Sequence, residues 1–218
     1  MSSVNPVLRT VLVIVLGVPA LVIVLHSLVR LVRAVYKFPM PQAAANLIDN
    51  PLRRRIQPPE EMAKRHGLAP GMTVLDVGPG NGTYTLAAAR HVGERGKVVA
   101  VDIEPKMIER VQRRVAVEGA TNIEARVADV YDLPFDDGSI DAVTMIAVIG
   151  ELPQPVRALR ELHRVLSPIG TVACSELLLD PDYPRARKLA RLAAAAGFQV
   201  RKKTGGFFHY TLMLEKGG

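Results

Sequence analysis

Residues 74–85 read VLDVGPGNGTYT, an apolar run interrupted by one acid, Asp76, and followed by glycine at every second position from residue 78 to residue 82. The apolar run predicts a buried strand, and the helical pattern that follows predicts that the chain turns directly into a helix. Gly78, Gly80 and Gly82 would let the backbone approach a ligand without interference from a Cβ atom, and would present amide groups at a helix N-terminus. The stretch therefore predicts a ligand-binding loop between a strand and a helix.

Strand and helix patterns alternate from Met72 onward, in the order TVLDV, TLAAARHV, KVVAVDI, PKMIERVQRRVAVEG, NIEARVADV. This alternation is typical of an α/β fold with an open parallel sheet. Ligands of such sheets bind beyond the carboxyl ends of the strands, beside the first strand. The glycine loop lies at that point, so we expect it to bind a nucleotide.

The spacing of the glycines indicates which nucleotide. A dinucleotide fingerprint needs G-x-G-x-x-G, but Thr83 stands at the third glycine position, which argues against a nicotinamide-dependent oxidoreductase. The order Asp76, Gly78, Gly80, Gly82 instead resembles motif I of the class I S-adenosylmethionine-dependent methyltransferases, in particular those with a type 11-like domain. The resemblance extends over residues 60–218. It implies a Rossmann-like sheet of seven strands with the last one antiparallel, flanked by helices, and S-adenosylmethionine as the cofactor.

The resemblance also assigns the rest of the cofactor site. Asp102 ends the second strand, where the family has an acid that accepts both ribose hydroxyls; a helix N-cap is the alternative. Asp129 matches the acid that meets the adenine amino group, with a surface turn as its alternative. Ile103 and Val130 would lie on either side of the adenine, and the Val130 amide would face the ring.

The C-terminal third follows the same family pattern. A helix is expected to end near Pro168 and Gly170, and a hairpin around Gly205-Gly206 predicts a reversed strand at the edge of the sheet. Cys174 lies in a strand-like apolar run and is expected in the core. We expect His163, on the preceding helix, to be structural.

Methyl transfer requires little from the protein, because the sulfonium already activates the methyl group and the enzyme mainly holds the nucleophile in line and excludes water. Glu151, after the fourth strand, is the candidate base, although it could equally contact the methionine moiety or cap the next helix. His209 and Tyr210 are further possibilities, and strand alternation sends them to opposite faces. No metal site is expected.

The N-terminal segment predicts a membrane anchor. Residues 10–29 contain no Asp, Glu, Lys or Arg, and 20 residues of helix span ~30 Å, the thickness of a bilayer core. The run exceeds the ~7–15 residues of a signal-peptide core, and RLVRAVYKF follows it rather than a cleavage site. Because more bases follow the run than precede it, the C-terminal part is expected in the cytoplasm.

The chain is thus expected to comprise an anchor at 1–38, a connector at 39–68 and a methyltransferase domain at 69–218. Stretches 42–50 and 58–68 of the connector can each form a short helix, and the connector is expected to cover the active site. The arginines at 53–55 either form a solvated face or contact anionic lipid headgroups.

Several features restrict the acceptor. Tryptophan is absent, and the basic clusters 185–191 and 201–203 contain no aromatic residue, which disfavours nucleic acid. The net charge of +7 is partly a property of the N-terminal segment, because all 21 acids follow residue 38. An anchor raises the local concentration of membrane-dissolved molecules, so we expect a small lipophilic acceptor: a phospholipid headgroup, a quinone precursor or a thiol. The alternative is a membrane-tethered scaffold that binds the cofactor without catalysis.

Overall fold

The computed structural model describes residues 6–36 and 49–217. The chain divides into two compact units, residues 1–37 and residues 38–218. The described residues of the first unit form one helix, α1 (Pro6–Val35). Within it, Val15–Arg33 is long and apolar enough to cross a membrane, a test that a soluble core helix or a signal sequence also passes.

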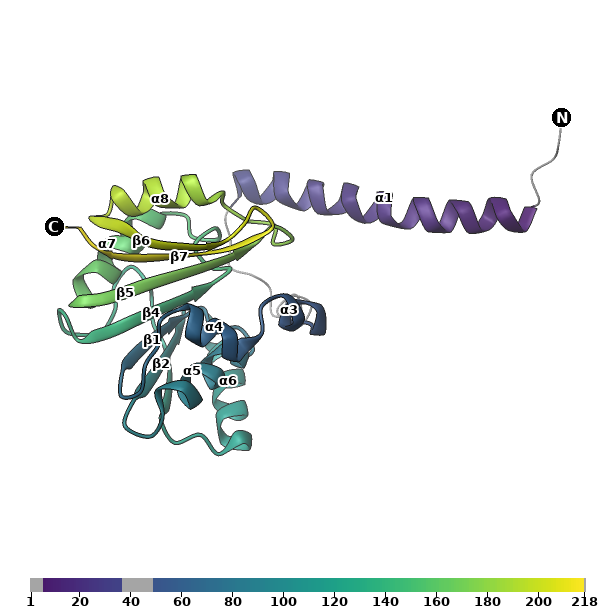
Figure 1. The fold of residues 1–218 in the computed structure, drawn as a ribbon. Helices are drawn as coiled ribbons and strands as arrows, with labels where there is room; N and C mark the ends of the chain where they lie inside the picture. Colours follow the sequence, from purple (N-terminus) through teal and green to yellow (C-terminus); the bar gives the residue numbers. More distant parts are fainter. Residues whose placement is uncertain (1–5, 37–48, 218) are drawn as a thin grey trace. The chain divides into compact units, whose positions relative to one another are not determined.

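The second unit is built on one seven-stranded sheet, drawn in Figure 1. Its strands are β1 (Thr73–Val77), β2 (Lys97–Asp102), β3 (Ile123–Val127), β4 (Ile140–Ile146), β5 (Leu166–Leu177), β6 (Phe198–Gly205) and β7 (His209–Lys216). They lie in the order β3-β2-β1-β4-β5-β7-β6. These strands are parallel, but the order in which they are added to the sheet reverses at β1, with β2 on one side and β4 on the other. This creates the switch point at which α/β sheets bind ligands.

Six helices belong to this unit within the described residues: α3 (Pro51–Ile56), α4 (Pro59–Arg65), α5 (Thr83–Val92), α6 (Pro105–Glu118), α7 (Pro155–Val165) and α8 (Ala186–Ala194). The amphipathic pattern of α6 buries Met107, Ile108 and Val111 against the sheet, as the 3.6-residue period of the sequence predicts. Gly119, at a φ of 66°, ends this helix in the left-handed conformation that glycine favours.

The predicted Rossmann-like sheet of seven strands is confirmed, including the antiparallel last strand, because β7 runs antiparallel to both β5 and β6. The prediction that the reversed strand forms the edge is wrong. The hairpin inserts β7 between β5 and β6, so the edge strand is β6. The burial pattern explains the order: β7 carries the buried Tyr210, Leu212 and Leu214, whereas β6 is exposed along most of its length.

The helix predicted to end near Pro168 and Gly170 ends earlier, at Val165, and β5 begins at the next residue. Pro168 and Gly170 lie in an irregular stretch of β5, where the pairing with β4 shifts between Ile140 and Ala142. A bulge of this kind accommodates proline inside a strand, because the ladder there needs no amide donor.

The connector supplies two of the helices. The helix expected within 58–68 is present as α4, and its end is tied to the sheet by a buried polar chain: His66 Nε2 lies 2.7 Å from Ser175 Oγ, which lies 2.7 Å from Thr211 Oγ1. Burial lowers the pKa of His66 to about 3, so the ring is neutral in this chain of contacts. The helix expected at 42–50 lies mostly outside the described residues, and α3 follows it.

Candidate functional site

A cavity of about 410 Å³ lies at the carboxyl ends of β1, β2 and β4. It brings together all but one of the residues that the sequence assigned to the site: Asp76, Gly78, Gly80, Asp102, Ile103, Asp129, Val130 and Glu151. Gly82 is the one predicted residue that does not line the cavity. The cavity lies at the switch point, where the fold predicts a ligand.

The glycine loop forms one wall of the cavity, and its backbone needs glycine. Gly78 has a φ of +67°, and a Cβ atom there would meet Val148 Cγ2 at 2.6 Å. Gly80 has a φ of +56°, and a Cβ atom there would find open space, which leaves its backbone accessible to a ligand. Gly82, at a φ of +76°, is the N-cap of α5 and sets the start of that helix.

Asp76 is buried where the loop begins. Its two carboxylate oxygens accept hydrogen bonds from Thr85 Oγ1 on α5 at 2.5 Å and from Thr144 Oγ1 on β4 at 2.9 Å. Burial raises the pKa of Asp76, although these two hydrogen bonds act in the opposite direction. The side chain therefore joins three elements that surround the loop, which fixes the shape of the cavity wall.

Asp102 ends β2 at the cavity. Its Oδ1 accepts a hydrogen bond from the Glu104 amide at 2.9 Å, and the N-cap of α6 is Glu104 rather than Asp102. Burial raises the pKa of Asp102, because the charged carboxylate loses solvation. Ile103, the next residue, is 55% exposed and presents an apolar side chain at the cavity.

Asp129 and Val130 approach the cavity from the turn after β3. The Asp129 carboxylate accepts a hydrogen bond from the Tyr131 amide at 2.9 Å, which is the local hydrogen bond of an Asx turn. Asp129 therefore forms the turn that was the alternative to a cofactor contact, and it also lies on the cavity wall. Val130 is 9% exposed and packs into the main hydrophobic core.

The segment after β4 forms another wall. Ala147 has a φ of 60°, an unfavourable conformation for a residue with a side chain, and its amide donates to the Ser175 carbonyl at 2.9 Å. Backbone strain of this kind is found at functional sites when the surrounding structure enforces it. Glu151 follows in the turn before α7 and lines the cavity, and the N-cap of that helix is Gln154, so Glu151 does not cap it.

Asp49 and Arg53 also line the cavity, and no motif identified them from the sequence. Arg53, on α3, forms a buried ion pair with Asp180, which lies in the loop after β5. Its NH1 also donates to Gln57 Oε1 at 3.3 Å. The signal available in the sequence was Asn50-Pro51, an N-cap followed by proline at the first helical position, which marks the start of α3.

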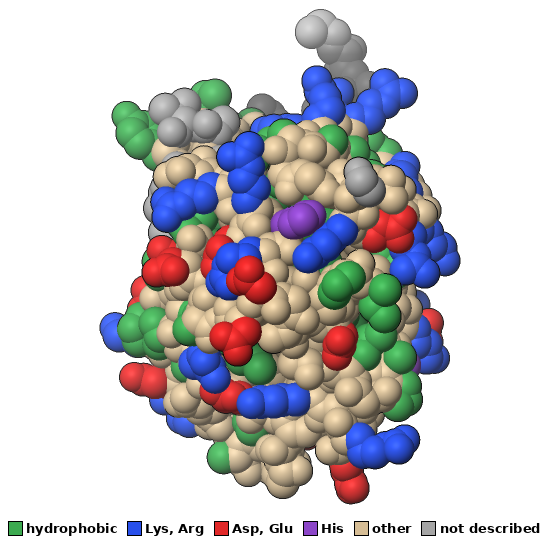
Figure 2. All heavy atoms as spheres, turned by 90° about the vertical axis from the view of Figure 1, so that its left-hand side faces the viewer, with side chains coloured by type: hydrophobic (Ala, Val, Ile, Leu, Met, Phe, Trp, Pro, Cys, Tyr) green, Lys and Arg blue, Asp and Glu red, His purple; other side chains and the backbone are tan. Residues whose placement is uncertain are grey.

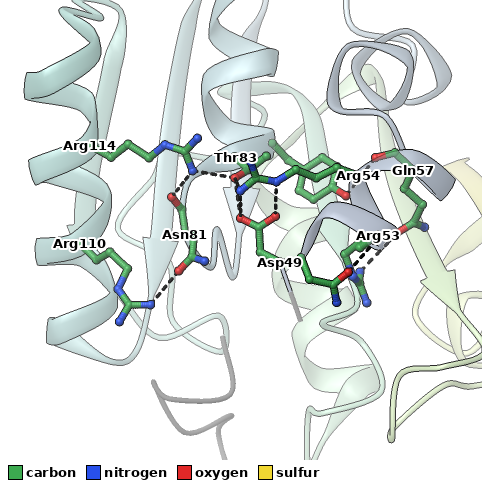
Figure 3. Close-up of polar contacts among 10 residues, drawn as sticks. Asp49, Arg53, Arg54, Gln57, Asn81, Thr83, Arg110 and Arg114 are labelled. Atoms are coloured by element: carbon green, nitrogen blue, oxygen red, sulfur yellow. Dashed lines mark hydrogen bonds and ion pairs between the residues drawn. The ribbon is translucent and has the colours of Figure 1, made fainter. Parts of the chain in front are cut away.

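A network of polar contacts joins α3 to the glycine loop (Figure 3). Arg54 and Asp49 form two hydrogen bonds, Nε to Oδ1 at 2.8 Å and NH2 to Oδ2 at 2.9 Å. Thr83 Oγ1 donates to Asp49 Oδ2 at 2.6 Å, and on the other side it accepts from Arg114 of α6 at 2.6 Å. Burial alone would raise the pKa of Asp49, but the hydrogen bonds from Arg54 and Thr83 hold it below its usual value.

Four other residues singled out in the sequence do not line the cavity: Cys174, His163, and the further candidate bases His209 and Tyr210. Cys174 is fully buried in the core of the sheet, as expected, and burial raises the pKa of its thiol. His163 packs against Phe198 with the two rings 5.1 Å apart, edge to face, which agrees with a structural role.

Comparison with known proteins identifies the central part of the chain. Residues 75–174 match the family model described as a methyltransferase domain. A crystal structure of a SAM-dependent methyltransferase from Aquifex aeolicus superposes with a TM-score of 0.76 at 26% identity, covering 81% of this chain and 98% of that one. Together with the domain match, this supports an S-adenosylmethionine-dependent methyltransferase with S-adenosylmethionine as its cofactor.

Two curated relatives share this domain. The arsenite methyltransferase of Halobacterium salinarum is 38% identical over 117 residues, which is 54% of this chain and 30% of the relative. The demethylmenaquinone methyltransferase of Lactococcus lactis is 35% identical over 113 residues, which is 52% of this chain and 45% of the relative. The chain thus spans less than half the length of these two relatives.

Proposed function

We propose that this protein transfers a methyl group from S-adenosylmethionine to a small lipophilic acceptor, and that its N-terminal helix anchors it in a membrane with the domain in the cytoplasm. The observation that carries the proposal is the cavity: residues that a methyltransferase would use for the cofactor, and a candidate base, line one space at the carboxyl end of the sheet. The comparisons support the reaction class.

The cavity wall fits the chemistry of this cofactor. We assign Asp102 to the ribose, because a carboxylate can accept hydrogen bonds from both hydroxyls of a diol. Asp129 and the Val130 amide would meet the adenine edge, and Ile103 would cover the ring. The open backbone at Gly80 would lie against the methionine moiety. Asp76 and Gly82 would hold the glycine loop in shape.

The bound cofactor supplies an activated methyl group, so the protein has to orient the acceptor and exclude water. The acceptor atom forms a bond to the methyl carbon as the bond from that carbon to sulfur breaks, and an acceptor that carries a proton on that atom loses it. Glu151 is the candidate to take this proton, because it lines the cavity after β4. Ile146, Val148 and Leu152 line the same region with apolar side chains, which suits a lipophilic acceptor.

The connector contributes to the same space. Asp49 and Arg53, both within residues 39–68, line the cavity, which supports the proposal that the connector covers the active site. A cover at this end of the sheet would reduce the access of water to the transferred methyl group.

The membrane and acceptor assignments rest on two observations. The α1 stretch Val15–Arg33 has the length and apolar character of a membrane-spanning helix. Relatives that match the domain include demethylmenaquinone methyltransferases, whose name specifies a quinone acceptor. Among phospholipid headgroups, quinone precursors and thiols, we therefore place quinone precursors first.

The test is calorimetric titration of the full chain, solubilised in detergent, with S-adenosylmethionine and separately with a reduced nicotinamide dinucleotide. We expect saturable binding of the first alone, followed by methyl transfer to a demethylated quinone in an acceptor screen. Binding of the dinucleotide would overturn the assignment of the loop. Cofactor binding without transfer to any of the three acceptor classes would favour the membrane-tethered scaffold.

A further inference from the structure

The hairpin between β6 and β7 lies at the same end of the sheet as the cavity. β6 runs antiparallel to β7, and β7 runs antiparallel to β5, so β6 is parallel to β5. The carboxyl end of β6 therefore lies at the same end of the sheet as the carboxyl ends of β1, β2 and β4, where the cavity lies. Figure 1 shows the hairpin tip at the same end of the unit as α3.

Three large apolar side chains are exposed at this edge. Phe207 is 64% exposed and Phe208 is 44% exposed at the hairpin tip, and Leu179 is 50% exposed in the loop after β5. Leu178, the neighbour of Leu179, donates its amide to the Phe208 carbonyl at 2.8 Å, so the two loops are joined. We call Leu179, Phe207 and Phe208 the apolar rim. Apolar side chains gathered at one exposed edge mark a binding surface more often than scattered ones do.

The loops that carry the apolar rim are held in place. The buried Tyr183 donates its hydroxyl to the Phe207 carbonyl at 2.5 Å, and its ring lies edge to face with the Phe207 ring at 6.3 Å. The exposed aromatic side chains therefore project from a fixed backbone. A fixed loop loses little conformational entropy when it binds a surface.

The apolar rim is linked to the cavity wall through Asp180. Leu179 is followed by Asp180, whose carboxylate is paired with Arg53, and Arg53 lines the cavity. The loop that carries Leu179 is thus joined to a residue of the cavity wall.

Basic side chains flank the apolar rim. Arg201, Lys202 and Lys203 are exposed on β6, within six residues of Phe207. Lys203 lies two residues before β6 ends at Gly205, about 7 Å at ~3.3 Å per residue, and Phe207 lies in the turn beyond, which places basic groups nearer headgroup level when the aromatic rings reach the upper acyl region. Arg185, Arg187 and Lys188 are exposed around the start of α8. By contrast, acidic and basic side chains are intermixed on the face shown in Figure 2.

The sequence also limits how far this unit can lie from α1. Fifteen residues separate Val35, which ends α1, from Pro51, which begins α3. A fully extended chain spans at most ~3.6 Å per residue, so this segment reaches roughly 55 Å. If α1 spans a membrane, the second unit is confined to a layer next to that membrane, where a weakly binding surface is occupied by effective concentration.

We propose that the apolar rim inserts into the interface of an anionic lipid bilayer and turns the mouth of the cavity toward the membrane. Aromatic side chains favour this interface, and the flanking bases add roughly 1 kcal/mol each near an anionic surface. The acceptor then passes from the bilayer to the cavity along Leu179 and Arg53. This inference rests on the proposed membrane anchoring.

Because the chain contains no tryptophan, a single introduced tryptophan reports its own depth. The experiment uses the full chain with Phe207→Trp, reconstituted in vesicles of phosphatidylcholine and phosphatidylglycerol with bromine on the acyl chains. The matched control is Ile169→Trp, because Ile169 is 91% exposed and lies near the opposite end of β5. We expect bromolipid quenching several times stronger at 207 than at 169, and weaker quenching at 207 in vesicles without phosphatidylglycerol.

A flotation assay separates this proposal from the anchoring on which it rests. If the wild-type chain does not float with vesicles, the anchoring fails. If it floats but quenching at 207 equals that at 169, the anchoring stands and the apolar rim does not insert. Phe208→Trp gives a second probe in case Phe207→Trp disturbs the fold, and the proposal requires the same excess of quenching over position 169.

Discussion

The two sides of the cavity are assembled in different ways. On the side of β1 and β2, the key groups belong to two short segments, Asp76–Gly82 and Asp102-Ile103, which end neighbouring strands. On the side of β5, Arg53 of α3 meets Asp180, 127 residues further along the chain. Local motifs can position the first set as soon as the strands pair, whereas the second set exists only when distant segments pack. We therefore expect mutations on the first side to change ligand binding, and mutations on the second to change stability as well.

The largest effect on the first side is expected from Asp102→Ala. If Asp102 binds the ribose diol, the variant loses two hydrogen bonds to a charged group, each contributing about 1.5–3 kcal/mol. Affinity for S-adenosylmethionine should fall by at least ~100-fold, with little change in thermal unfolding. Calorimetric titration of the full chain measures this. Normal affinity in the variant would contradict the assignment of Asp102, and Asp102→Asn, which keeps one acceptor oxygen, should fall between the two.

The largest effect on the second side is expected from Arg53→Met. It removes one partner of a buried ion pair and leaves Asp180 without its countercharge, which typically costs 3–5 kcal/mol. Burial already raises the pKa of Asp180, and Arg53 acts in the opposite direction, so its removal would raise this pKa further. Thermal unfolding monitored by circular dichroism reports the loss.

The double variant Arg53→Met with Asp180→Asn provides the control for this prediction. It removes both charges, so most of the lost stability should return. If the single variant is as stable as the wild type, Arg53 and Asp180 do not form the buried pair in solution.

The same contrast explains how much could be predicted from the sequence. The succession of strands and helices from β1 to β3 and most of the residues of the cavity wall followed from a motif and from alternating strand and helix patterns, because each of these signals is local. The sequence could not place Arg53 in the cavity, because its position depends on a partner far along the chain. The sequence identified Arg53 only as part of a basic run, for which a solvated face and a lipid contact were the two alternatives. Its neighbours Arg54 and Arg55 are exposed.

The edge of the sheet was mispredicted for a related reason. Both strands of the last hairpin were recognised, but which of them pairs with β5 depends on burial across the whole sheet. Tyr210 donates its hydroxyl to the Pro184 carbonyl at 2.6 Å and is fully buried, which requires β7 to lie inside. A hairpin motif carries no information about that choice, since either strand can form the edge.

The pH dependence of stability tests the β5 side of the cavity through Glu176. This carboxyl is buried at the end of β5, and burial, with the charges of Asp180, Glu151 and Asp182, raises its pKa well above the usual 4.5, although Arg53 lowers it. Its Oε1 has no hydrogen-bond partner among the described residues. The folded state thus keeps a proton that the unfolded chain has lost, so stability falls as pH rises above 4.5 toward the folded pKa.

Glu176→Gln removes this titration and keeps the shape of the side chain. We expect the free energy of unfolding to depend less on pH above 4.5 in the variant than in the wild type. Denaturant titrations at a series of pH values measure the difference. Parallel pH profiles for the two proteins would show that Glu176 is not held in its protonated form.

The smallest effect on stability is expected from Arg54→Met, which tests whether α3 covers the cofactor. Arg54 pairs with Asp49 but its side chain is 43% exposed, and surface pairs of this kind contribute about 0.2–1 kcal/mol. The effect should appear instead in the dissociation rate of S-adenosylmethionine, because the pair joins α3 to Thr83 beside the glycine loop.

Arg55→Met is the matched control, since it removes the same charge from the next, exposed position. Faster dissociation in the first variant alone, with a difference that shrinks at high salt as screening weakens the pair, would establish α3 as the cover. Equal rates in the two variants would mean that the network in Figure 3 stabilises the fold without retaining the ligand.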